Sequence, residues 1–117
     1  MEPTGSGESA NASLDELPEL VMIPLGTRGV QRIKLKHCQY CSNDDPSSLK
    51  LLERSVKNLG EGQDAISYLV LCERCSHRFT FHCRNVYSTD RGEKKRVVSF
   101  VSVLDEEGKD QGWLGNF

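Results

Sequence analysis

Apolar and polar residues alternate along two stretches of this chain, at 30–36 and 78–87. This is the pattern of β-strands that have one buried face. Shorter runs that are almost wholly apolar or rich in valine accompany them, and we expect these to be strands as well. Turn residues between neighbouring runs predict hairpins, and hence an antiparallel sheet. The strands predicted in this way cover residues 20–25, 30–36, 65–71, 78–87 and 97–104.

Residues 47–59 have a different spacing, which predicts an amphipathic helix. Apolar residues fall at positions i, i+3, i+7 and i+10, along one face of a helix. A Pro-Ser turn precedes this segment, and Gly60 follows it as a helix-ending residue. The apolar positions are Leu49, Leu52, Val56 and Leu59.

Two C-x-x-C motifs flank the predicted helix, with a spacer of thirty residues between them. Paired cysteines at such a separation are typical of a structural zinc site with four thiolate ligands. We therefore expect one structural Zn²⁺, held by Cys38, Cys41, Cys72 and Cys75. The predicted fold is a small α+β zinc-binding domain, an antiparallel sheet with one helix inserted between the two C-x-x-C motifs.

The remaining cysteine and the histidines lie beside these motifs. His77 follows Cys75 by two residues, whereas His82 and Cys83 are neighbours on a predicted strand and point to opposite faces. Whether any of these three takes part in metal binding stays open at this point. Four thiolates leave no open coordination position, and no nucleophile with an adjacent base stands out, so we do not expect an enzyme.

The order of strand, C-x-x-C, spacer, strand running into C-x-x-C, and strand resembles the zinc-ribbon group. Residues 68–79 in particular are similar to the second half of the ribbons in RNA polymerase subunits and transcript elongation factors. The resemblance covers residues 30–87 and implies a module that contacts nucleic acid or a transcription-related machine. The chain departs from that group in three respects: Ser42 and Ser76 stand where ribbons often have glycine, the spacer holds a predicted helix, and no Asp-Glu pair lies between the motifs.

Charge divides the chain into an acidic beginning and a more basic middle. Residues 1–27 carry five acids and no Lys or Arg, and residues 28–43 carry four bases and no acid, within a net charge of −2. We expect a disordered acidic leader at 1–19, a zinc-ribbon-like domain at 20–108 and a flexible tail with Trp and Phe at 109–117. Without a run of 18 apolar residues or a secretory signal, we expect an intracellular protein, cytoplasmic or nuclear, with reduced cysteines.

Two kinds of binding follow as hypotheses. In the first, basic side chains contact nucleic-acid phosphates; the candidates are Arg32, Lys34, Lys36, Arg74, Arg78, Arg84, Lys94, Lys95 and Arg96. In the alternative, the chain is a protein-interaction adaptor that uses apolar segments near its ends, with zinc purely structural. The candidates for that role are Leu17, Leu20, Trp113 and Phe117.

Overall fold

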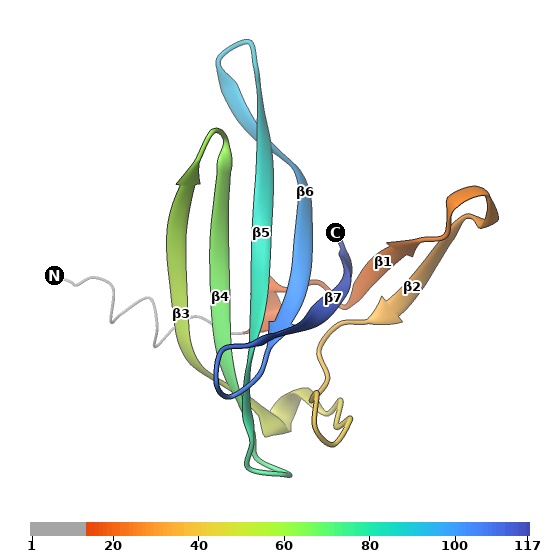
Figure 1. Ribbon diagram of the computed structural model, residues 1–117, viewed down its shortest axis with the longest axis vertical. Helices are drawn as coiled ribbons and strands as arrows, with labels where there is room; N and C mark the ends of the chain where they lie inside the picture. Colours follow the sequence, from red (N-terminus) through yellow and green to blue (C-terminus); the bar gives the residue numbers. More distant parts are fainter. Residues whose placement is uncertain (1–13) are drawn as a thin grey trace, which may run out of the picture.

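The computed structural model describes residues 14–117, apart from the side chain of residue 90. In this part of the chain, seven strands form one antiparallel sheet in the order β2-β1-β7-β6-β5-β4-β3 (Figure 1). The strands are β1 Leu20–Pro24, β2 Val30–Lys34, β3 Leu49–Gly60, β4 Gln63–Cys72, β5 Arg78–Asp90, β6 Glu93–Leu104 and β7 Asp110–Asn116. Three short 3-10 turns complete it: η1 Leu14–Glu16, η2 Gly26–Arg28 and η3 Pro46–Ser48.

The predicted helix at 47–59 is absent, and the α+β class is wrong. Residues 47–48 belong to η3, and the rest of the segment forms β3, which pairs with β4 along its length, so the described chain is nearly all antiparallel sheet. The cause lies in the turn that follows, where Gly60, Glu61 and Gly62 all have positive φ angles of 78°, 51° and 74°. Such a turn returns the chain as a hairpin, and cross-strand pairing then outweighs the helical spacing.

The predicted strands are confirmed, and three of them, β4, β5 and β6, are longer than expected. β1 and β2 form the first hairpin, from Leu20 opposite Lys34 to Pro24 opposite Val30. β5 and β6 extend to the turn at residues 91–92, and Figure 1 shows their tip projecting beyond the β3–β4 hairpin.

The segment assigned to a flexible tail contributes a strand. β7 lies between β6 and β1 and is paired with both. Gly115 makes this possible, because a Cβ atom there would lie 2.9 Å from the side chain of Val21. The first 13 residues of the predicted leader lie outside the described part of the chain, whereas Leu14 and Leu17 are buried.

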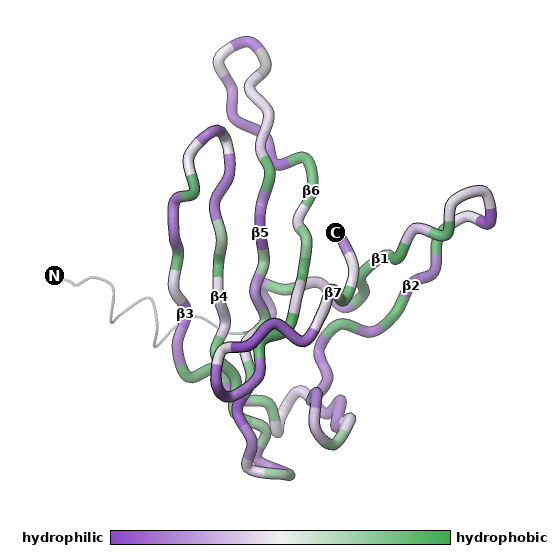
Figure 2. The backbone as a smooth tube through the Cα atoms, in the orientation of Figure 1, coloured by the Kyte–Doolittle hydropathy of each residue, from purple (hydrophilic) through white to green (hydrophobic). Residues whose placement is uncertain are grey.

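The sheet has two unlike faces because its residues alternate. The inner face carries the core, which is built on Tyr68, Val70, Phe79, Phe81, Cys83, Val101 and Val103. Leu14, Leu17, Val21 and Leu35 pack against these residues in the same cluster. The outer face carries the intervening side chains, most of them polar or half-exposed. Figure 2 shows apolar and polar positions following one another along the strands.

Candidate metal centre

Four cysteine sulfurs meet at the end of the sheet where β4 passes into β5. Residues 38–41, the first knuckle, follow β2, and residues 72–75, the second knuckle, join β4 to β5. The four Sγ atoms all lie within 4.8 Å of one another. The Sγ atoms of Cys38 and Cys75 are 3.5 Å apart, and those of Cys41 and Cys72 are 3.7 Å apart. Four thiolates at about 2.3 Å from a tetrahedral zinc ion have sulfurs about 3.8 Å apart, so the donor set and spacing fit such an ion.

Each knuckle closes with the same backbone turn. Ser42 N–H donates to the Cys38 carbonyl at 3.0 Å, and Ser76 N–H donates to the Cys72 carbonyl at 2.7 Å. Ser42 and Ser76 have φ angles of 63° and 64°. These two serines therefore occupy the left-handed conformation for which related turns use glycine, and the departure noted in the sequence leaves the knuckle geometry intact.

Hydrogen bonds to the sulfurs make their thiols unequal. Burial raises the pKa of Cys38 to about 12. Burial also raises the pKa of Cys72, but hydrogen bonds from the Asn43 side chain and from the N–H groups of Cys75 and Arg74 outweigh it and lower that pKa to about 6. Asn43 Nδ2 lies 3.5 Å from Cys72 Sγ. Donors of this kind hold the thiolate form that a metal ion requires.

A second network ties both knuckles to the turn between β6 and β7. The rings of Tyr40 and His77 stack with centroids 4.5 Å apart. His77 Nδ1 lies 3.0 Å from a carboxylate oxygen of Glu106, and this hydrogen bond lowers the pKa of Glu106. The Glu106 N–H donates to the Tyr40 hydroxyl at 3.1 Å. The two knuckles are thus in contact beyond their sulfurs.

Among the described residues, the cluster of possible metal ligands consists of the four knuckle cysteines, and neither a histidine side chain nor Cys83 belongs to it. His82 points to the outer face, where its Nδ1 lies 3.2 Å from the Ser67 hydroxyl. Cys83 is buried in the core beside Phe81, as its place on an alternating strand predicts, and burial raises the pKa of this thiol to about 12. All five cysteines are free thiols.

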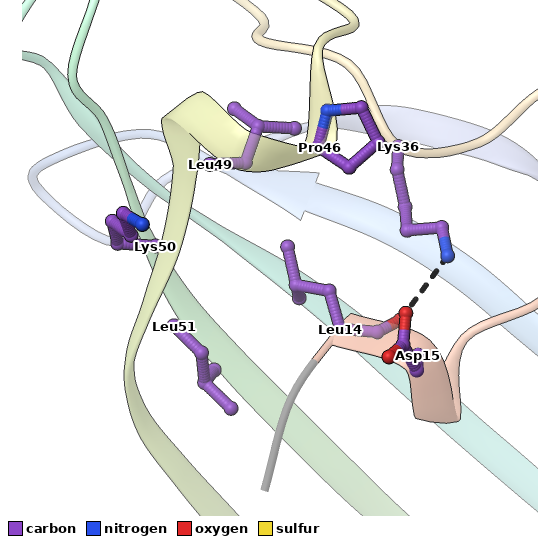
Figure 3. A pocket seen from close by; sticks show the side chains of 7 residues that line it. All are labelled: Leu14, Asp15, Lys36, Pro46, Leu49, Lys50 and Leu51. Carbon is purple, nitrogen blue, oxygen red and sulfur yellow. Dashed lines mark hydrogen bonds between the residues drawn. The ribbon is translucent and has the colours of Figure 1, made fainter.

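Lys36, one of the predicted nucleic-acid contacts, is used inside the fold. It is buried, and its Nζ atom donates to the carbonyl oxygens of Leu14 and Leu17 at 3.4 and 3.3 Å. Figure 3 shows the Lys36 side chain directed at η1 across a hollow of about 290 Å³, which Leu49 and Pro46 also line. Its ammonium group is therefore not available to bind the phosphates of a nucleic acid.

The other predicted basic residues are spread over several separate regions of the fold. Arg32 and Lys34 lie on β2, Arg74 on the second knuckle, Arg78 and Arg84 on the outer face, and Lys94 and Lys95 at the β5–β6 tip. Several have partners in the fold: Lys34 pairs with Asp44, Lys94 lies over Tyr87, and Lys95 is 4.0 Å from Glu93. Arg96 donates to Ser99 and stacks on Phe117. The nine residues do not form one patch.

Of the four apolar residues proposed for partner binding, two pack within the fold and two are exposed. Leu17 is buried, and Phe117 packs against the core beneath Arg96. Leu20 and Trp113 are 46% and 47% exposed. Leu20 and Trp113 are therefore the more accessible of the four, and Phe117 is half-buried.

Comparison with known protein families finds no family model that matches this chain, and comparison with curated proteins and with solved structures finds no similar protein. What remains of the zinc-ribbon resemblance is a four-cysteine cluster, compatible with zinc, on a small sheet-rich domain. In the described residues, no helix is long and apolar enough to cross a membrane.

Sequence reasoning missed the residues that support the cluster. Asn43 follows the first knuckle by two positions and gave no signal beyond its place in a turn. Glu106 lies 29 residues from its partner His77, a separation at which the sequence pattern carries no information about pairing.

Proposed function

We propose that this chain is a non-enzymatic binding module, stabilised by one structural zinc ion, that binds single-stranded nucleic acid across the outer face of its sheet. We place it inside the cell, where cysteines stay reduced and available to zinc. The four-thiolate cluster supports the structural role of the metal, because four protein ligands leave no position for a substrate.

The observation that carries the nucleic-acid proposal is the composition of the outer face. The strand register puts Lys57, Arg84 and Phe100 in one cross-strand row, and Lys50 and Arg78 flank Leu71 in another. The four basic side chains, Lys50, Lys57, Arg78 and Arg84, are all exposed. Away from the β5–β6 tip, the acids that the register places on this face across β3 to β7 are Glu53 and Asp110. The outer face is therefore more basic than a chain of net charge −2 would suggest, which favours a polyanion.

Aromatic rings lie among these charges. The Arg84 guanidinium is 4.7 Å from the ring centroid of Phe100, and Trp113 is 47% exposed opposite Ser102. Bases of single strands stack on aromatic side chains and on arginine planes. A hollow of about 250 Å³ spans the outer face from β3 to β6 and is lined by Ser67 and Leu69 among others. It offers space for a nucleobase beside these aromatic and basic side chains.

Fluorescence anisotropy with labelled single-stranded RNA and DNA of mixed sequence tests the proposal. We expect binding that weakens steeply as salt rises, and a loss of tenfold or more in affinity for the Arg78→Ala/Arg84→Ala variant, since each phosphate contact contributes to counterion release. Trp113 is the single tryptophan of the chain, so its fluorescence reports contact with the outer face directly.

Lys94→Ala/Lys95→Ala is the matched control, because it removes the same charge from the β5–β6 tip and leaves the rows of Lys50, Lys57, Arg78 and Arg84 unchanged. Affinity close to that of the wild type is expected for it. Absence of binding at low salt, or equal losses in the two double variants, would refute the nucleic-acid proposal.

The alternative, a protein adaptor, is favoured by one separate observation on the β1–β2 hairpin. Leu20 and Met22 are 46% and 39% exposed, and they lie opposite Lys34 and Arg32 on one face of it. Such a mixed apolar and basic surface suits an acidic, amphipathic partner segment. A partner retained by the wild type and lost on Leu20→Ser/Met22→Ser would support this alternative.

A further inference from the structure

β3 forms one edge of the sheet (Figure 1). It pairs with β4 on one side, and no segment in the described part of the chain pairs with its other side. In antiparallel sheets, every second residue of such an edge directs its N–H and C=O groups away from the neighbouring strand. β3 has 12 residues, and Leu52, Val56 and Leu59 are 42%, 57% and 43% exposed along it. A long edge of this kind is a place where another strand adds to the sheet.

The middle of β3 is complementary to itself. Residues 53–58 pair with β4 without any shift in register, and Glu53, Ser55 and Lys57 alternate onto the outer face. When a second copy of β3 runs antiparallel along the free edge with Ser55 opposite Ser55, Glu53 of each copy lies opposite Lys57 of the other. The two-fold symmetry makes this contact twice, and opposite charges across a strand pair are stabilising.

The neighbouring registers lack this match. Side chains on the same face must stay opposite one another, so the register can move only by two residues. A move in one direction places Arg54 opposite its own copy, which brings two guanidinium groups together. A move in the other direction places Val56 opposite its own copy and leaves Glu53 and Lys57 without opposite charges across the pair.

We propose that β3 joins two copies of this chain into a symmetric dimer, by antiparallel pairing centred on Ser55 with Glu53 opposite Lys57. The pairing extends the sheet of one copy into that of the other. It uses none of the metal-binding cysteines and does not depend on nucleic-acid binding.

Sedimentation equilibrium of the zinc-loaded full chain, from micromolar to hundreds of micromolar protein, tests the dimer. We expect the wild type to dimerise, and both Lys57→Glu and Glu53→Lys to raise the dimer dissociation constant by about tenfold or more, since two attractive pairs become repulsive. The double variant Glu53→Lys/Lys57→Glu restores the pairs with reversed sign, and its dissociation constant should return to the wild-type range. Lys50→Glu is the control, because this register places Lys50 opposite Gly60, and it should leave dimerisation unchanged.

Zinc content and circular dichroism establish that each variant is folded. A chain that stays monomeric at the highest concentration overturns the proposal, as does a dimer that the single charge variants do not weaken. Failure of the double variant to recover overturns the register. Amide exchange gives an independent readout: protection that increases with concentration in β3 supports the pairing, and protection confined to another segment contradicts it.

Discussion

At the residue scale, Asn43 connects the two knuckles. Its backbone carbonyl accepts a hydrogen bond from Cys38 N–H at 2.7 Å, and its side-chain Nδ2 lies 3.5 Å from Cys72 Sγ. Asn43 is 5% exposed, so these contacts are shielded from water. A buried donor of this kind lowers the energy of a thiolate and fixes its direction.

We expect Asn43→Ala to weaken zinc binding by about tenfold, at the lower end of what loss of a supporting hydrogen bond costs metal sites. Competition against a chromophoric zinc chelator measures this affinity. Gln39→Ala is the control from the same knuckle, because the Gln39 side chain contacts His37 and no sulfur. Equal affinities for the two variants would contradict the role given to Asn43.

The serines that end the knuckles carry backbone strain that glycine would relieve. A non-glycine residue in the left-handed region costs about 1–2 kcal/mol, partly offset by the greater freedom of glycine in the unfolded chain. We expect Ser76→Gly to stabilise the zinc-loaded protein by up to about 1 kcal/mol in denaturant unfolding. Ser88→Gly, within β5, should destabilise it. A loss of stability for Ser76→Gly would refute this reading of its φ angle.

At the element scale, β3 shows where sequence patterns mislead. Leu49, Leu52, Val56 and Leu59 have helical spacing, yet in the strand only Leu49 is buried and the other three are exposed. The turn Gly60-Glu61-Gly62 determines the outcome: Gly60 was predicted to end a helix, but this sequence also suits the turn of a hairpin. The alternation in β5, by contrast, predicted the inward direction of Phe79 and Phe81 correctly, because burial of one face dictates it.

Replacement of an exposed valine by alanine tests the strand assignment, because the change in stability has opposite signs in a strand and in a helix. Val56 is 57% exposed, so replacement by alanine removes little packing. In a strand, Val56→Ala should destabilise by about 0.5–1 kcal/mol, whereas in a helix it would stabilise by about 0.5 kcal/mol. Denaturant unfolding of dilute protein measures the change. Val30→Ala, in β2 and 47% exposed opposite Pro24, provides a reference in a paired strand and should also destabilise.

At the scale of the whole molecule, the four-cysteine cluster joins two parts of the chain that have few other links. Within residues 14–117, the β1–β2 hairpin pairs with the rest of the sheet at a single position, Met22 opposite Asn116. Its other attachments include the side chains of Val21, Ile33 and Leu35, which pack in or against the core, and the knuckle that follows β2. The spacing of the cysteines predicted this junction, but nothing in the sequence indicated that β7 would lie between β1 and β6.

Metal removal should therefore loosen the two parts unequally. On chelation of zinc from the full chain, we expect amide protection to fall first in residues 20–48 and to persist longest in β4, β5 and β6, because those three strands pair along nearly their full lengths. Hydrogen exchange with and without a chelator measures this order. A uniform loss of protection, or an unchanged pattern, would contradict the linking role of the metal.

X-ray absorption spectroscopy at the zinc edge tests the central claim most directly, because it counts and identifies the ligand atoms of the bound ion. The arrangement of Cys38, Cys41, Cys72 and Cys75 predicts one zinc per chain, with four sulfur ligands at about 2.3 Å and no nitrogen or oxygen in the coordination shell. A shell with a histidine nitrogen or water in place of a sulfur, or a purified, reduced chain that binds no zinc, would contradict the account.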